Sequence, residues 1–204
     1  GNSNLLGKIM IKNINTRTKL LLFPLMFVII VVISGFVYSH YSGVQNTRIH
    51  VAMQTDEFIQ QLLKGRISVY QFLRAPTDVN EQKVVDNFKI LDEDVTKLKS
   101  RLTAEKNKVL SDEILASSKE YVNNFKIVSS KIMINQKNGI KEETAEIKAT
   151  ITKMAESGVV LEKKIDEIHE SAMQLSEEAE SLLNTILSVL AVVAVLVFVL
   201  FSLL

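Results

Sequence analysis

The sequence contains no cysteine, and it has only two prolines and seven glycines in 204 residues. Without cysteine the chain can have neither a disulfide framework nor a thiolate metal site. So few helix-breaking residues favour long helices over a β architecture. The composition therefore predicts an all-α protein.

Acidic residues are missing from the first 55 positions. Four basic residues precede position 20, whereas residues 41–181 hold all 23 acids and the other 20 basic residues, which gives that segment a net charge of −3. Those mixed charges do not resemble a nucleic-acid surface, so we expect no nucleic-acid partner. A basic start next to an apolar run is a signal of membrane topology. The four basic residues are Lys8, Lys12, Arg17 and Lys19.

Two apolar runs are long enough to cross a membrane. The first, residues 20–37, carries no charge, and 18 residues at about 1.5 Å each approach the roughly 30 Å of a hydrocarbon core. The second has 23 uncharged residues. We predict transmembrane helices at 20–40 and 182–204. The alternative for the first is a cleavable signal peptide, but the run is long for one and no small-residue cleavage site follows it.

The distribution of basic residues predicts the orientation in the membrane. Lys and Arg gather on the cytoplasmic side of membrane spans. We therefore expect residues 1–19 to be cytoplasmic and residues 41–181 to lie in the periplasm or outside the cell. The second span returns the chain to the cytoplasm, so both termini are cytoplasmic and the protein resides in the inner (plasma) membrane.

The segment between the spans has helical periodicity throughout. We predict helices at about 41–75, 78–102, 104–137 and 140–181, joined by short connections. Four such helices form an antiparallel up-down-up-down bundle. The last helix has the clearest pattern, with small or apolar residues in 4-3 steps at Ile147, Ile151, Met154, Gly158, Leu161, Ile165, Ile168, Ala172 and Leu175.

The breaks between the predicted helices carry start and stop signals. Pro76 disfavours helix at the residue before it, and Asp78 with Glu81 resembles a capping box. Thr103 is the predicted N-cap of the third helix. Asn138 followed by Gly139 is a typical helix stop. No break separates the fourth helix from the second span, so we expect one unbroken helix from Ile140 to Leu204.

No motif for catalysis or cofactor binding is present. The sequence lacks a glycine-rich phosphate loop, a nucleophile elbow and an H-E-x-x-H zinc motif. His40, His50 and His169 do not share a metal-ligand spacing. We expect no enzyme activity, no cofactor and no metal.

One helix carries a wider apolar stripe than a bundle core needs. The apolar residues of helix 41–75 spread over roughly 220° at 100° per residue, which suggests a second partner besides the core. Arg66 lies inside this stripe, Arg74 lies two turns further on the same side, and Gly65 leaves room beside Arg66. We consider two roles for Arg66. One is an anion site at a subunit interface, and the other is a snorkelling side chain or an internal salt bridge.

The stretches RISVYQFLRAPTD and KVVDNFKILDEDVTKLKSRL resemble the first two helices of the sensor domain of bacterial methyl-accepting chemotaxis proteins. The order of basic start, anchor, extracytoplasmic bundle and second span is also similar to the input half of these receptors. The resemblance implies a homodimer that binds small ligands between bundles, often through arginines of the first helix. Arg66 and Arg74 are the matching candidates, and the ligand could be an anion.

The sequence departs from that family after the second span. It has no adaptor and no methylation or kinase-control region before Leu204, so we expect a fragment that reaches a cytoplasmic kinase or adaptor only through a region absent here. A sensor histidine kinase or cyclase with the same input module is one alternative. A structural two-span coiled-coil protein without a ligand is another.

Overall fold

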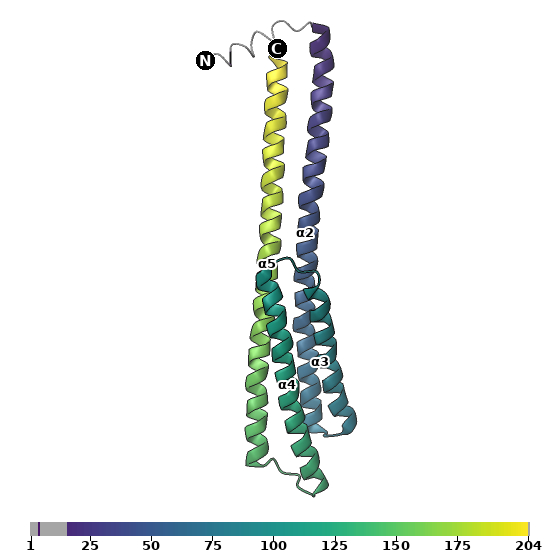
Figure 1. The fold of residues 1–204 in the computed structure, drawn as a ribbon, viewed down its shortest axis with the longest axis vertical. Coiled ribbons are helices and arrows are strands. Elements are labelled where there is room, and N and C mark those ends of the chain that lie inside the picture. The colour runs from purple at the N-terminus through teal and green to yellow at the C-terminus, as the bar shows by residue number, and fades with distance from the viewer. Residues whose placement is uncertain (1–3, 5–15, 204) are drawn as a thin grey trace. The chain divides into compact units, whose positions relative to one another are not determined.

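A computed structural model describes Asn4 and residues 16–203, and its longer elements are all α-helices (Figure 1). Successive helices run in opposite directions and pack as a bundle, which confirms the predicted all-α antiparallel four-helix architecture. Lys8, Lys12 and Leu204, which enter the topology prediction, lie outside the described residues. The helices are α2 (Thr16–Arg74), α3 (Asp78–Lys99), α4 (Glu105–Lys137) and α5 (Ala145–Ser202).

The predicted 4-3 stripes form the core of the bundle. Every residue of the α5 stripe from Ile147 to Ala172 is buried except the half-buried Ile151. Such burial removes apolar surface from water and is the main force that holds a bundle together. The largest fully buried side chains are Phe58, Phe72, Phe88, Phe125, Leu91, Leu98, Ile114, Leu161, Ile165, Ile168, Val84 and Val95.

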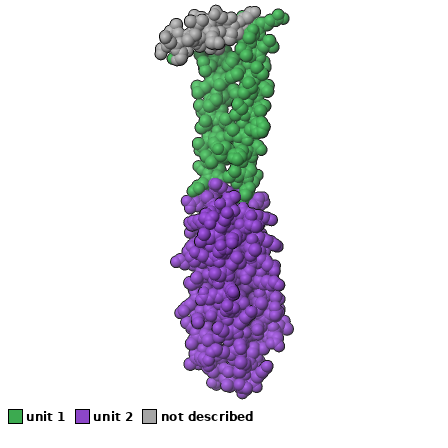
Figure 2. Space-filling model, in the orientation of Figure 1, with its two compact units in different colours: residues 1–47, 177–204 green, residues 48–176 purple. Residues whose placement is uncertain are grey.

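The chain divides into two compact units, which Figure 2 distinguishes by colour. One unit holds residues 48–176, which form the bundle, and the other holds residues 1–47 and 177–204. In the second unit the most apolar windows of α2 and α5 are fully exposed and long enough to cross a membrane. Their length and composition make both of them candidate membrane spans. Within this unit Phe23 packs edge to face on Phe198 and Phe201, at centroid distances of 5.9 and 5.8 Å.

Two predicted N-cap residues are wrong. Helix α3 is capped by Thr77, whose Oγ1 accepts a hydrogen bond from the Asn80 amide at 3.1 Å, and not by Asp78. Thr77 wins because its backbone is extended while Asp78 is already helical, so only Thr77 can cap the first turn. The N-cap of α4 is Ala104, which makes no side-chain capping bond, so Thr103 does not have the predicted role.

The connection between α4 and α5 is longer than predicted. Gly139 has φ of 76°, and Ile140 N–H donates to the Asn135 carbonyl at 2.9 Å, which is the pattern of a Schellman stop. Helix α5 begins at Ala145 and not at Ile140, because Thr144 Oγ1 accepts from the Ile147 amide and caps the new helix. From Ala145 to Ser202 the helix is then continuous.

Candidate functional site

One residue from each helix meets in a layer that runs through the middle of the bundle. Phe88 of α3 and Tyr121 of α4 pack with ring centroids 4.9 Å apart. A Cβ atom on Gly65 of α2 would lie 2.7 Å from Phe88 Cζ, and one on Gly158 of α5 would lie 2.9 Å from Tyr121 Cε2. Both distances are shorter than van der Waals contact. The two aromatic rings therefore fit because the facing helices carry glycine.

Arg66 follows Gly65 and joins α2 to α5 across this layer. Its Nη2 donates to the Gly158 carbonyl at 3.1 Å and pairs with Glu162 Oε2 at 3.0 Å. The side chains of Arg66 and Glu162 are 30% and 47% exposed, so the pair lies at the rim of the bundle. Of the two roles considered for Arg66, this structure contains the internal salt bridge.

A groove of about 310 Å³ opens beside Arg66. Tyr121 contributes to its lining and is itself buried. The lining side chains include one cation, Arg66, and one carboxylate, Glu162, while most of the rest are apolar. A site of this kind can hold a small molecule with an apolar body and one charged end. The apolar lining consists of Val69, Leu73, Ile151, Met154, Ala155 and Val159.

The Tyr121 hydroxyl remains neutral at any physiological pH. Burial raises the pKa of Tyr121 to about 12, against the opposing effect of the nearby Arg66 charge. A neutral phenol can donate a hydrogen bond to an anion or accept one from a cation. Tyr121 therefore adds a polar group to the groove without adding charge.

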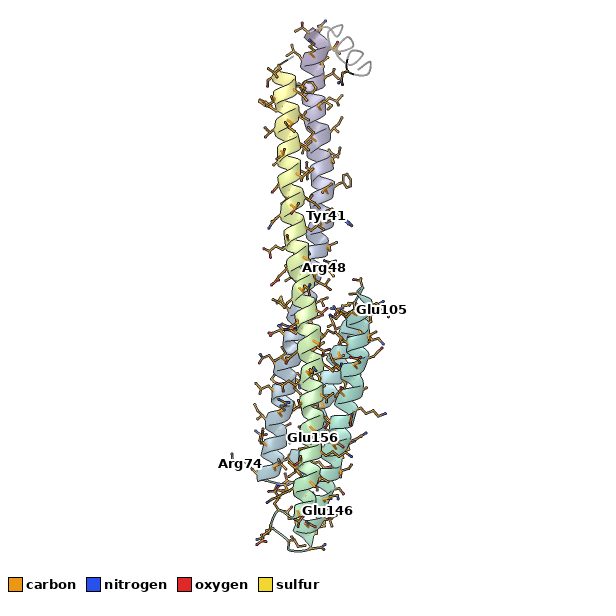
Figure 3. All side chains as sticks on the ribbon, turned by 90° about the vertical axis from the view of Figure 1, so that its left-hand side faces the viewer. Tyr41, Arg48, Arg74, Glu105, Glu146 and Glu156 are labelled. Atoms are coloured by element: carbon orange, nitrogen blue, oxygen red, sulfur yellow. The ribbon has the colours of Figure 1, made fainter. Side chains whose placement is uncertain are left out.

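Arg74 lies in a different place from Arg66. It is the last residue of α2, as Figure 3 shows, and is exposed. It lines a cavity of about 560 Å³ formed with the α4–α5 connection. Eight residues of helix separate the two arginines by about 12 Å. The cavity at Arg74 also contains Lys141, Glu142 and Glu143, so its charges are mixed. The two predicted ligand residues thus line different pockets. Arg66 lines the groove, where it is the single cation, and Arg74 lines the cavity with mixed charges.

Sequence reasoning missed three residues of the groove. Tyr121, Gly158 and Glu162 were not among the predicted ligand residues, which were Arg66 and Arg74. A glycine at a core position of a heptad was the signal available for Gly158, because a core position normally carries a large side chain. Nothing in the sequence pairs Glu162 with Arg66, since the two residues are 96 positions apart.

In the part of the chain that the structure describes, titratable groups form no metal site. Across residues 16–203 no three His, Asp or Glu side chains gather closely enough to hold a metal ion. His169 Nδ1 lies 3.1 Å from Thr55 Oγ1, whose single proton is donated to the Ala52 carbonyl at 2.7 Å. The ring therefore donates through Nδ1 and joins α5 to α2.

Asp92 of α3 lies where burial disfavours a charge. Burial raises the pKa of Asp92 above its ordinary value of 3.8, and the Ser118 hydroxyl on α4 opposes the rise. That hydroxyl lies close enough to act on the charge, yet neither Ser118 Oγ nor Asp92 Oδ1 makes a hydrogen bond of ordinary geometry within the described chain. The ionised form of Asp92 is therefore under-solvated in the folded state.

Asp92→Asn is expected to stabilise the protein against unfolding at neutral pH, because it removes the under-solvated charge. Below pH 3.8 the wild-type carboxyl is protonated in both folded and unfolded states, and no penalty exists. As the pH rises through the elevated pKa of the folded state, the penalty develops and stability falls. Urea unfolding should thus show a larger advantage of the variant at pH 7 than at pH 4.

Glu93→Gln is the matched control, because Glu93 is the exposed acid next to Asp92 in the same helix. The difference between the two variants at each pH separates the burial of Asp92 from the general effect of losing one carboxylate of α3. A destabilised Asp92→Asn protein at pH 7 would contradict the assignment.

Comparison of the chain with protein-family models, with curated proteins and with solved structures gives no match. The interpretation of the groove therefore depends on its geometry and chemistry.

Proposed function

We propose that this chain is the input module of a transmembrane receptor, of the kind that methyl-accepting chemotaxis proteins use. In this proposal the bundle, as residues 41–181, senses a small molecule outside the cytoplasm. Residues 20–40 and 182–204 are the membrane helices, and residues 1–19 are cytoplasmic. The module has no enzyme activity of its own and passes its signal to a cytoplasmic region beyond Leu204.

The observation that carries the proposal is the connection between bundle and candidate spans. The first and last helices of the bundle, α2 and α5, each continue without a break into an exposed apolar segment long enough to cross a membrane. Between Gly158 and Ser202 no glycine or proline interrupts α5. A stiff helix of this kind can pass a shift of an ångström or two between two places, as receptor helices do.

The groove beside Arg66 is the proposed ligand site. A guanidinium is suited to bidentate capture of a carboxylate, and the neighbouring Tyr121 hydroxyl supplies a second polar contact. Arg74 provides a second positive charge at the cavity near the end of α2. The proposed ligand is therefore a small organic anion, and no metal or cofactor takes part.

A receptor that carries this module on its own signalling region gives the direct test. Residues 1–204 fused to the adaptor and kinase-control region of a chemoreceptor should change kinase output with at least one member of a panel of small organic acids. Arg66→Ala should weaken that response at least tenfold, because a charge-assisted hydrogen bond is lost. The chain has no cysteine, so Ser130→Cys labelled with an impermeant reagent checks that the bundle lies outside. The proposal is contradicted if the kinase output of a correctly inserted fusion changes with none of the acids. It is also contradicted if the Arg66→Ala fusion responds to them as strongly as the parent fusion.

We also propose that two copies pair through α2. Part of its wide apolar stripe is buried in the bundle, but Leu63, Ile67 and Tyr70 are 53%, 48% and 68% exposed. These positions follow 4-3 steps and so share one face of the helix. A continuous exposed apolar face of this kind is typical of an interaction surface.

Ile67→Cys is expected to form a disulfide between two copies in membranes under mild oxidation, because symmetry places the same residue on both sides of the pair. Lys89→Cys on the exposed face of α3 is the control and should stay monomeric on a denaturing gel. Equal dimer yields from the two variants would count against pairing through α2.

Two alternatives to a chemoreceptor module remain. One differs in its output domain, and the other binds no ligand. The input module of a sensor histidine kinase or cyclase would share the bundle and both spans and differ only beyond Leu204. A structural two-span protein without a ligand is favoured by one observation, namely that Glu162 already neutralises Arg66. The acid panel separates this last reading from a receptor.

A further inference from the structure

The cation in the proposed ligand site is not free to bind an anion as it stands. Nη2 of Arg66 contacts both the Gly158 carbonyl and the Glu162 carboxylate. Both partners belong to α5, so this single nitrogen fastens α2 to α5 beside the groove. We refer to these three residues, Arg66, Gly158 and Glu162, as the clasp.

The clasp is easy to open from the solvent side. Nearly half of the Glu162 side chain and almost a third of the Arg66 side chain are exposed, so water competes for both charges. Ion pairs with this exposure contribute little to stability. Nη1 and Nε of Arg66 have no hydrogen-bond or ion-pair partner among residues 16–203. A second carboxylate that approached them would meet the negative charge of Glu162 on the same guanidinium.

The groove next to the clasp selects the kind of carboxylate that could compete. Its walls are mostly apolar, Tyr70 and Val159 are exposed at its mouth, and Tyr121 is buried. A volume of about 310 Å³ is at the lower end of known ligand sites. With only Arg66 to balance charge, a dicarboxylate would leave one anion among apolar side chains, which is costly.

We infer that a small monocarboxylate with an apolar body binds in this groove, displaces Glu162 from Arg66, and so breaks the ion pair of the clasp between α2 and α5. The inference rests on the proposed ligand site and adds the class of ligand and the event that binding triggers. The ligand carboxylate takes the Nη2 position that Glu162 leaves, and its apolar body covers Val69, Met154 and Val159. Glu162 then turns into solvent, since two carboxylates repel each other at one guanidinium.

Calorimetric titration of the full chain in lipid nanodiscs tests the inference, with benzoate as the probe. Benzoate should bind wild type, whereas benzamide, which lacks the charge, and acetate, which lacks the apolar body, should bind at least tenfold more weakly. Glu162→Gln removes the competing charge, so benzoate affinity should rise about two- to fivefold, which is the strength of an exposed ion pair. Arg66→Gln should lose benzoate binding.

The matched control is Glu156→Gln, because Glu156 is an exposed acid of the same helix outside the lining of the groove (Figure 3). It should leave benzoate affinity unchanged. Arg66→Lys keeps the positive charge but lacks the planar guanidinium, so its benzoate affinity should be intermediate. This variant keeps the test valid if Arg66→Gln fails to fold. Thermal unfolding of each variant reports folding directly.

Three results would overturn the inference. Unchanged or weaker benzoate binding by Glu162→Gln means that Glu162 is not displaced. Acetate or benzamide binding as tightly as benzoate means that the groove does not select an apolar monocarboxylate. No benzoate binding by wild type, together with an Arg66-dependent kinase response of the fusion to another acid, overturns the inference but leaves the proposed function intact. If benzoate binds as expected but no acid changes the kinase output of the fusion, the inference stands and the proposed function is overturned.

Discussion

Gly65→Ala is expected to destabilise the bundle although alanine is the better helix former. Alanine in place of glycine gains about 1 kcal/mol of helix propensity. Against this, the added Cβ would lie 2.7 and 2.8 Å from two ring atoms of Phe88, a side chain that is 1% exposed and packed on Tyr121. Overpacking of a closed core costs about 1–3 kcal/mol, so the net loss should lower Tm by several degrees in circular dichroism melts.

Two further variants isolate the cause of that loss. Gly43→Ala places a methyl group where no atom lies within 4 Å, so it should be neutral or slightly stabilising. In a Phe88→Leu background the ring atoms are gone, and Gly65→Ala should become neutral or stabilising. If Gly65→Ala still destabilises the protein in that background, contact with the Phe88 ring is not the reason that position 65 requires glycine.

Insertion of one alanine after Leu182 is expected to abolish the ligand response of the receptor fusion. One extra residue in a continuous helix turns everything that follows it by about 100°. In α5 the buried Ala179 and Leu183 and the half-buried Ile186 and Leu190 follow 4-3 steps, and the insertion breaks that register. Kinase output with and without ligand is the measurement.

The control is one alanine inserted at Thr103, in the connection between α3 and α4, where no helical phase is altered. Its response should equal that of the parent fusion. A response that survives the insertion after Leu182 with unchanged threshold would mean that α5 does not transmit the signal as a stiff helix.

The sequence by itself determined the architecture. The 4-3 steps in each segment, the scarcity of glycine and proline, and the stop signals at Pro76 and at Asn138–Gly139 are local features, and each acts through backbone geometry or through burial of one helix face. The core stripe of α5 from Ile147 to Ala172 follows directly from them. The two apolar runs are also local features, because length and composition alone decide whether a helix can span a membrane.

Helix ends were harder to predict, because neighbouring residues compete for the same role. Thr77 and Asp78 are both good caps, and the backbone conformation of Thr77 decides between them. Ile140 continues the apolar pattern of α5, yet Gly139 and Thr144 place the helix start after it. These choices depend on φ and ψ at single residues, which composition does not determine.

Only the tertiary structure decided what surrounds Arg66. From the sequence its guanidinium lies in an apolar stripe, and either a ligand or an internal partner can accompany it. The bundle brings Gly158 and Glu162, more than 90 residues away, within 3.1 Å of its Nη2. Arg74 lines a different cavity, because residues 66 and 74 lie about 12 Å apart along a straight helix. Contacts between helices depend on which heptad layers align across the bundle, and no single helix carries that information.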